Sequence, residues 1–276
     1  MANQISSEER KEKIEYLLSK EAYDFDDLVL IVTILRSEGG CPWDIEQTHK
    51  SLRRDFIEET YEVIEAIDTE NPTLLREELG DVMLQVVFHA DIEREEGRFD
   101  ISGVANDICA KLIHRHPHVF GTVEVKDKDE VLVNWDKIKG EEKQRVTHTD
   151  KLRSIPPMLP ALMRAQKVGK KASFFDFGTA EEVISKLYEE IDEVKEAYED
   201  GERAHIEEEI GDLLLTVTSL CRKVGVDAEE AMNKATNKFI DRFERVENKT
   251  LEAGKNIEEM SMSELDAIWD KIKAQK

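Results

Sequence analysis

Acidic side chains occur in both halves of the chain at a spacing that suits the binding of a divalent metal ion. In each half, two carboxylates three positions apart are followed by a second such pair after fifteen intervening residues. Residues i and i+3 share one face of a helix, so each pair would form an acidic edge. Four carboxylates brought together repel one another, and a hard cation bound between them removes that repulsion. A donor set of oxygens without His or Cys favours Mg²⁺, or Mn²⁺, over zinc. The candidate ligands are Glu59, Glu62, Glu78 and Asp81 in the first half, and Glu190, Glu193, Glu209 and Asp212 in the second.

An antiparallel helical hairpin would bring the two acidic pairs of the first half together. The periodic segments that carry them are separated by a short break at 69–72, which favours antiparallel packing of neighbouring helices. Residues equally distant from the turn of a hairpin lie at the same level on opposite helices. Positions 59 and 81 average to 70, as do 62 and 78, so Glu59 is expected to face Asp81 and Glu62 to face Glu78.

The second half of the chain repeats the first. Both acidic motifs recur with a displacement of 131 positions, and the second hairpin is centred on Gly201, within an Asp-Gly turn signal. A Lys-x-Ile-x-Arg segment at Lys111 recurs at Lys238, and a Trp-Asp-Lys-Ile-Lys segment at Trp135 recurs at Trp269. Three blocks in the same order indicate a duplicated domain.

Each acidic motif also has a simpler interpretation, as the solvated face of a helix in a chain rich in Glu. Repetition at identical spacing, with matched levels across the turn, favours the metal site instead. Gly80 and Gly211 lie inside the predicted helices, where Gly costs about 1 kcal/mol relative to Ala. The gap that each leaves would let a neighbouring helix or a ligand approach closely.

The basic and aromatic residues downstream allow two interpretations each. Lys238 and Arg242 are four positions apart and share a helix face, either as surface partners of Glu or as a clamp for phosphate groups. Trp135 and Trp269 would be core residues, or platforms on which a base stacks without strong base preference. The His-Arg-His-Pro-His segment at 114–118 lacks the ligand spacing of a zinc site, so we expect its histidines to form capping and loop hydrogen bonds.

Composition and length limit the class of protein. With a net charge of −23, the chain lacks the basic balance needed to bind a nucleic-acid polymer. Three widely spaced cysteines predict a reducing, cytoplasmic location, and the apolar stretches are far shorter than the roughly 20 residues of a membrane helix. The periodicity is helical and shows no alternating pattern of useful length, so we expect an all-α fold. The expected organisation is a charged extension at 1–23, a first domain at 24–145, a linker at 146–165 and a second domain at 166–276.

The ordered set of motifs resembles the MazG-type nucleoside triphosphate pyrophosphohydrolases in their tandem-domain form. The resemblance rests on CPWD at 41–44, the paired acidic motifs in both halves, HPHVFG at 116–121 and the final WDKIK, and covers residues 24–276. It implies an all-α homodimer that hydrolyses an NTP or dNTP to the monophosphate and pyrophosphate with Mg²⁺, in cleansing of the nucleotide pool. It also implies that the eight carboxylates hold the metal. By the same resemblance the substrate contacts are Lys186, Lys238, Arg242 and Trp269.

Glu189 and Lys186 lie beside the acidic motif of the second half. Glu189 is the candidate to orient or deprotonate the attacking water, although a position behind the metal ligands would suit it equally. Lys186 corresponds to Asp55 in the first copy, so an anion there replaces a cation one turn before the acidic motif. We therefore expect the second copy to be the better catalyst, and the first to be weaker, differently selective or mainly structural.

Two other classes of protein compete with this interpretation. A ferritin-like di-metal protein also uses carboxylates in a helical bundle, but requires Glu-x-x-His on two helices. The chain has this pattern at Glu46 and His49 and at Glu202 and His205, both near predicted loops. A helical interaction module without catalysis would have acidic helices that only keep it hydrated.

Overall fold

The computed structural model describes residues 6–142 and 147–274, and within these ranges the chain is helical, without strands. Contacts divide the chain into two compact units, Met1–Lys139 and Gly140–Lys276. The all-α fold and the antiparallel hairpin expected in each half are therefore confirmed. Within the described ranges, no helix combines the length and the apolar character needed to cross a membrane.

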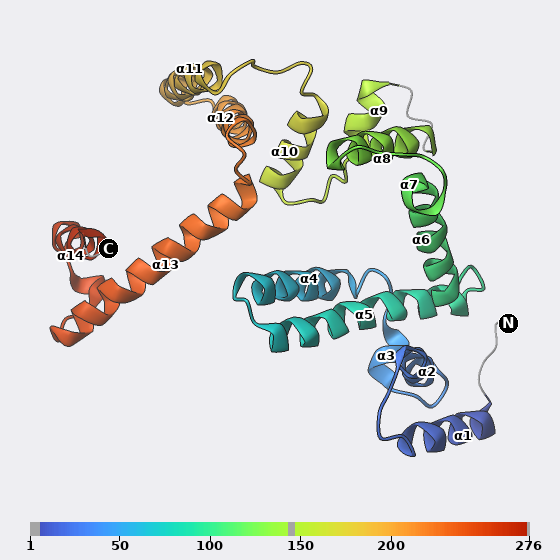
Figure 1. Ribbon diagram of the computed structural model, residues 1–276. Helices are drawn as coiled ribbons and strands as arrows, with labels where there is room; N and C mark the ends of the chain where they lie inside the picture. The colour runs from blue at the N-terminus through green and yellow to red at the C-terminus, as the bar shows by residue number, and fades with distance from the viewer. Residues whose placement is uncertain (1–5, 143–146, 275–276) are drawn as a thin grey trace. The chain divides into compact units, whose positions relative to one another are not determined.

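The first unit is built around the hairpin of helices α4 and α5 (Figure 1). Asn71 caps α5 by accepting hydrogen bonds from two backbone N–H groups, and Pro72 begins the helix, as the sequence predicts. Helix α2 packs against α5, where Val32, Val87 and Phe88 form a buried cluster with Leu52. The helices are α1 (Ser7–Leu18), α2 (Phe25–Arg36), α3 (Pro42–Glu46), α4 (Arg53–Asp68), α5 (Pro72–Glu95), α6 (Ile101–Arg115), α7 (Pro117–Phe120) and α8 (Lys128–Glu142), the last of which crosses the boundary between the units.

A buried ion pair fixes α2 to α5 in the first unit. The guanidinium of Arg36 lies 3.4 Å from the carboxylate of Asp91, and both side chains are almost completely buried. Arg36 also donates to the backbone carbonyls of Asp44 and Gln47, and Asp91 accepts from the hydroxyl of Thr33. This network holds the segment that leads into α4, and so helps to set the position of the hairpin.

The second unit is built around the hairpin of α11 and α12. Helix α11 ends at Asp200 and is capped by Gly201, which has a φ of 74°, a left-handed conformation that Gly adopts without the strain of a Cβ atom. Helix α10 packs against α12 and the start of α13, and α14 packs against α13. The elements are α9 (His148–Arg153), α10 (Ala161–Lys171), α11 (Ala180–Asp200), α12 (Arg203–Lys223), α13 (Ala228–Glu252), a 3₁₀ turn η1 (Ile257–Glu259) and α14 (Met262–Ala274).

The segment expected to be a linker has structure of its own. Helix α9 lies within 146–165, and α10 begins inside the same range. Thr147 caps α9 by accepting a hydrogen bond from the backbone N–H of Asp150, whose side chain accepts from Thr147 in return. Pro156, Pro157 and Pro160 lie between the two helices. The detailed domain boundaries remain a prediction.

Candidate active site

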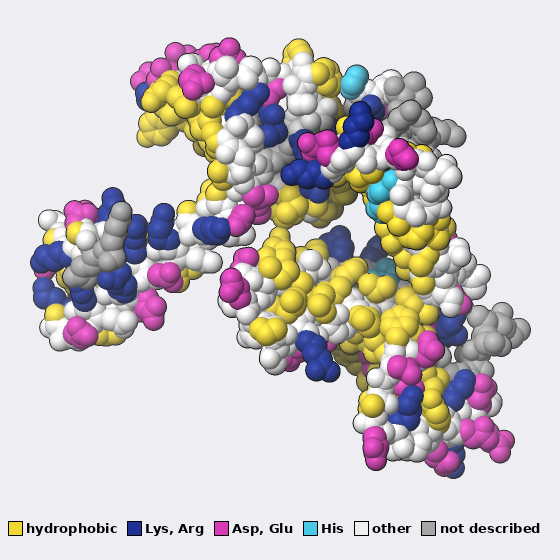
Figure 2. Space-filling model, in the orientation of Figure 1, with side chains coloured by type: hydrophobic (Ala, Val, Ile, Leu, Met, Phe, Trp, Pro, Cys, Tyr) yellow, Lys and Arg dark blue, Asp and Glu magenta, His cyan; other side chains and the backbone are white. Residues whose placement is uncertain are grey.

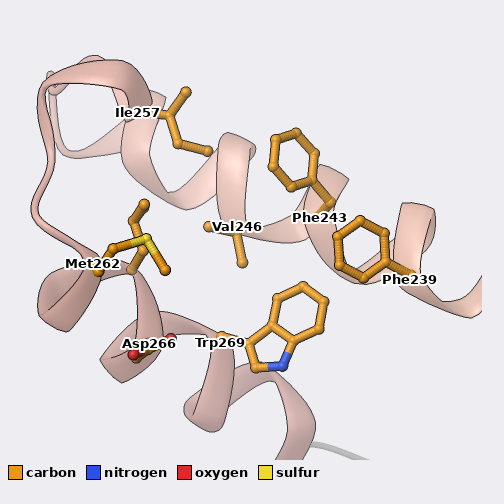
Figure 3. A pocket seen from close by; sticks show the side chains of 8 residues that line it. Phe239, Phe243, Val246, Ile257, Met262, Asp266 and Trp269 are labelled. Atoms are coloured by element: carbon orange, nitrogen blue, oxygen red, sulfur yellow. The ribbon is translucent and has the colours of Figure 1, made fainter. Parts of the chain in front are cut away.

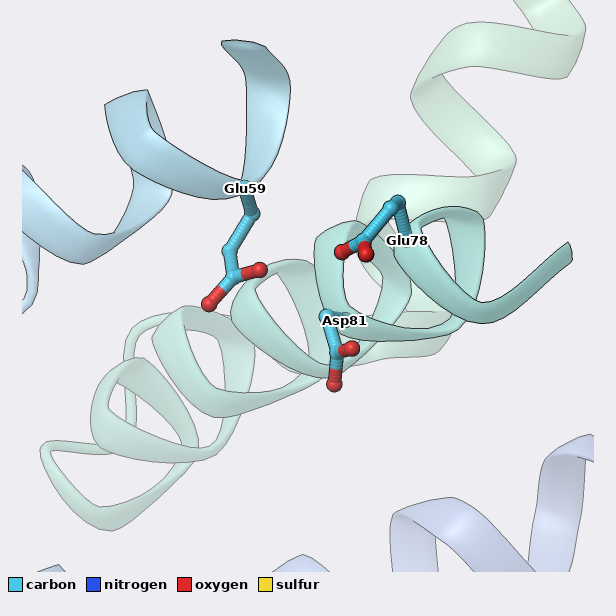
Figure 4. Close-up of side chains that lie close together, drawn as sticks. All are labelled: Glu59, Glu78 and Asp81. Carbon is cyan, nitrogen blue, oxygen red and sulfur yellow. The ribbon is translucent and has the colours of Figure 1, made fainter. Parts of the chain in front are cut away.

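In the first hairpin, carboxylates from both helices approach one another. Glu59 on α4 and Glu78 and Asp81 on α5 each offer an oxygen, and these oxygens lie within 4.8 Å of one another. Figure 4 shows the carboxylate of Glu59 pointing from its helix toward those of the other two. We call Glu59, Glu78 and Asp81 the first cluster. Their separation suits a shared cation, because one ion can contact several carboxylate oxygens at once.

Burial and electrostatic repulsion together raise the pKa values of Glu59 and Glu78 in the first cluster. Burial, followed by the negative charge of Asp81, raises the pKa of Glu59 to about 7. The pKa of Glu78 is also raised, by burial and then by the charge of Glu62. Glu62 is therefore near Glu78, although it is outside the group of three closest carboxylates.

The second hairpin brings together the equivalent set with one difference. Glu190 and Glu193 on α11 and Glu209 on α12 have oxygens within 4.8 Å of one another, and we call them the second cluster. Glu190 is buried, and its Oε2 atom has no hydrogen-bond partner. A buried oxygen left without a partner is costly, and a bound cation would satisfy it. Asp212, expected opposite Glu190, is exposed and lies outside the cluster.

Lys186 projects into the second cluster from one turn earlier on α11. Its Nζ atom lies 2.7 Å from Glu189, 3.1 Å from Glu190 and 3.6 Å from Glu193. The hydrogen bond with Glu189 raises the pKa of Lys186, and that with Glu190 acts in the same direction. Burial raises the pKa of Glu193, although the charge of Lys186 opposes the change. Glu189, the predicted water-orienting residue, is therefore engaged with Lys186 on the exposed side of the helix.

A histidine that the sequence analysis left out of the site contacts the second cluster. His205 Nε2 lies 3.3 Å from Glu209, and Nδ1 lies 3.6 Å from Asp200. The sequence could have predicted this contact, because His205 and Glu209 are four positions apart and such residues are neighbours on the surface of a helix. Leu74 occupies the equivalent position in the first copy, so this contact is specific to the second hairpin.

The other predicted substrate residues lie on α13 and α14. Lys238 and Arg242 project from α13, and among the described residues neither forms an ion pair with the carboxylates of the hairpin. Trp269 on α14 lines a pocket of about 250 Å³ with Phe239, Phe243 and Met262 (Figure 3). Its indole packs against the ring of Phe239, so the pocket has an aromatic wall.

In the first copy, Trp135 has different neighbours. The guanidinium of Arg115 lies 5.2 Å from the centroid of the indole, and the ring of His116 meets it edge-on with centroids 4.8 Å apart. His116 also hydrogen-bonds through Nδ1 to the carbonyl of Leu112, in agreement with the loop role expected for these histidines. A ferritin-like site needs Glu-x-x-His from two helices; His205 contacts Glu209 of the second cluster, but His49, in the other such pattern, contacts Glu93 outside both clusters.

Fold and clusters together place the chain among all-α proteins built from a duplicated acidic hairpin. The MazG nucleotide pyrophosphohydrolase domain matches residues 47–120 and again residues 178–247, so that each match contains one hairpin. The chain therefore belongs to the MazG family and is an enzyme, a hydrolase of the tandem form.

Several named relatives are similar over almost the whole chain. The nucleoside triphosphate pyrophosphohydrolase/pyrophosphatase MazG of Thermotoga maritima is 44% identical over 251 residues, or 90% of this chain and 95% of the relative. The nucleoside triphosphate pyrophosphohydrolase of Escherichia coli K12 is 43% identical over 257 residues, or 91% and 97% of the two chains. A protein of the same name from Mycobacterium tuberculosis is 33% identical over 249 residues, 88% of this chain and 65% of its own.

Proposed function

We propose that the enzyme hydrolyses nucleoside triphosphates, or their deoxy forms, to the monophosphate and pyrophosphate in a Mg²⁺-dependent reaction, with Mn²⁺ as a possible substitute. The observation that carries the proposal is the convergence of three carboxylates in each hairpin, of which two, Glu59 with Glu190 and Glu78 with Glu209, correspond at a displacement of 131 residues. The names of the relatives supply the substrate class. Removal of unwanted nucleotides from the cellular pool is the role that we assign to the activity.

The carboxylates of the two clusters would hold the metal. Every donor atom is an oxygen, which suits Mg²⁺, and the buried Oε2 of Glu190 lacks any other partner. Magnesium bound there would polarise the phosphoryl oxygens and lower the pKa of a bound water. We assign Glu62 and Asp212 to the same ligand sets by their places in the repeated motifs, although both lie outside the groups of closest carboxylates.

The remaining residues bind and orient the substrate. Lys186, Lys238 and Arg242 would neutralise the triphosphate, and Trp269 would stack against the base in its aromatic pocket. Glu189 would orient the attacking water or accept its proton, once its contact with Lys186 is broken. None of these contacts reads the edge of a base, so we expect weak discrimination among bases.

The test is an assay of the purified protein against a panel of NTPs and dNTPs, with pyrophosphate and orthophosphate measured separately. We expect one pyrophosphate per monophosphate, no orthophosphate, and loss of activity with EDTA. Glu190→Gln should lower activity by about a hundredfold or more. Glu199→Gln, on the exposed side of α11, is the matched control and should leave it unchanged. Release of orthophosphate, or iron-dependent oxygen consumption, would contradict the proposal.

We further propose that the enzyme is a homodimer in the cytoplasm. Both hairpins expose large apolar side chains at equivalent positions, each between 43% and 69% exposed: Ile57, Leu79 and Met83 in the first, and Tyr188, Ile210 and Leu214 in the second. Figure 2 shows such side chains gathered over α4 and α5. A surface of this kind favours burial against another subunit. All three cysteines have free thiols, which suits a reducing compartment.

Sedimentation analysis tests the dimer. Leu214→Glu should weaken or abolish it, because a charge would be buried in the interface. Met158→Glu, at an exposed position outside both hairpins, should leave the assembly intact. A wild-type protein that sediments as a monomer at high concentration would rule out the assembly.

A further inference from the structure

The second cluster already contains a positive charge. Lys186 Nζ reaches carboxylates of both Glu190 and Glu193, and only 28% of the Lys186 side chain is exposed. One ammonium group thus partly neutralises two of the three carboxylates that the proposed function assigns to the metal. A cation seated among these oxygens would meet the ammonium within a few ångströms, at a distance where like charges repel strongly.

The first cluster has no equivalent charge. Asp55 occupies the position of Lys186, and Glu59, Glu78 and Asp81 form no ion pair with any described residue. His205 adds a second difference, since it contacts Glu209 in the second cluster while Leu74 stands at the equivalent place in the first.

We propose that Lys186 is a built-in counter-ion of the second cluster, and that a divalent cation must displace it in order to bind. This proposal rests on the proposed function and concerns how its two metal sites are loaded. It has two consequences. The first cluster binds the cation more tightly than the second in the absence of nucleotide. In the second cluster, metal and substrate bind cooperatively, because the phosphates of a nucleotide attract the displaced ammonium.

The cooperativity follows from linkage. A triphosphate that draws Lys186 away from Glu190 removes the charge that opposes the metal, so it raises the affinity of the second cluster for the cation. By thermodynamic necessity, the bound cation raises the affinity for the triphosphate by the same factor. The second site would therefore fill with metal mainly when substrate is present.

The experiment is a Mn²⁺ titration of the full-length protein, with free Mn²⁺ measured by electron paramagnetic resonance. Without nucleotide, we expect two classes of site, with Glu59→Gln removing the tighter class and Glu190→Gln the weaker one. Lys186→Met should raise the affinity of the weaker class by at least about tenfold, because the opposing charge is gone. Asp55→Lys should lower the affinity of the tighter class, which tests the same idea in the other hairpin.

Controls separate this proposal from the proposed function. Lys195→Met removes an exposed lysine of α11 that pairs with Asp192 outside the cluster, and should change neither class. A nucleotide whose α–β bridging oxygen is replaced by methylene should raise the affinity of the second cluster in the wild type and much less in Lys186→Met. If neither Lys186→Met nor Asp55→Lys changed the Mn²⁺ affinity of the two classes, the counter-ion proposal would be wrong and the metal sites would still be supported. Absence of Mn²⁺ binding at either cluster, with or without the nucleotide, would overturn the proposed function itself.

Discussion

The indole of Trp269 and the ring of Phe239 pack against each other with centroids 5.3 Å apart and planes tilted by 46°. The two residues lie on different helices, α14 and α13, and form the aromatic wall of the pocket in the second unit. Phe239 directly follows Lys238, so the aromatic wall and the proposed phosphate clamp share helix α13.

Trp269→Ala should therefore weaken substrate binding in the second site. Stacking of a base on an aromatic side chain contributes about 1–3 kcal/mol, which corresponds to a rise in KM of roughly 5- to 150-fold. We expect kcat to change much less, since the indole does not contact the reacting phosphates. Steady-state kinetics with Trp269→Phe as the comparison checks this, because Phe keeps a stacking surface. Equal KM values for Ala and wild type would exclude Trp269 as the base platform.

The two hairpins should contribute unequally to the activity. Glu193→Ala should reduce kcat/KM by about a hundredfold, while Glu62→Ala, its equivalent in the first copy, should have a much smaller effect. The reason is that only the second cluster has a lysine that can move to the substrate phosphates. Pyrophosphate release by each variant at saturating Mg²⁺ is the measurement, and equal losses would contradict the inequality of the copies.

The hairpin symmetry of the sequence predicts the level of each carboxylate along the helices, but not its direction around them. Residues three apart differ by about 60° around the helix axis, so one member of a pair can point across the hairpin while the other points outward. Glu209 belongs to the second cluster, whereas Asp212 is exposed and lies outside it. In the first copy Glu78 and Asp81 both join the cluster at the same spacing, so side-chain conformation also decides which carboxylates converge.

Contacts between distant segments were harder to predict than the hairpins. The repeat, the turn at Gly201 and the start of α5 at Pro72 depend on local spacing and capping, which the sequence displays directly. The packing of Trp269 on Phe239 depends on how α14 returns along α13, and no local pattern encodes that path. Lys186 was predicted to contact substrate, whereas its ion pairs with Glu190 and Glu193 depend on side-chain conformations that spacing alone does not fix.

Gly211→Ala should raise the stability of the protein and lower its activity. A Cβ atom at this position would meet nothing within 4 Å, so Ala removes the helix penalty of Gly and should stabilise the chain by about 1 kcal/mol. Activity should fall by about tenfold, because the added methyl group fills the gap left for a ligand or a second subunit. Urea unfolding and pyrophosphate release measure the two effects.

Gly225→Ala is the matched control for this prediction. The site is equally open, but its φ of 72° is strained for Ala, so the substitution should destabilise the chain by about 1–2 kcal/mol. If Gly211→Ala were more stable and fully active, the open space beside the second cluster would have no part in binding.

Acid should remove a stabilising interaction at the end of α5. Arg98 lowers the pKa of Glu93 to about 2, and the contact of Glu93 with His49 acts in the same direction. Since an unfolded chain has the ordinary value near 4.5, the folded state favours the ionised form. The interaction therefore contributes to stability fully above about pH 4.5, and the contribution is lost as the pH falls toward 2.

Arg98→Gln, which removes the larger cause of the lowered pKa, should be less stable than the wild type at pH 7, and the difference in stability should shrink at pH 3. Urea unfolding at both pH values measures it, with Arg54→Gln as a control, because Arg54 is 89% exposed and lies 3.9 Å from Glu58. The wild type and Arg98→Gln both keep His49. If the difference in their free energies of unfolding stayed constant between the two pH values, Arg98 would act through packing and not through the charge of Glu93.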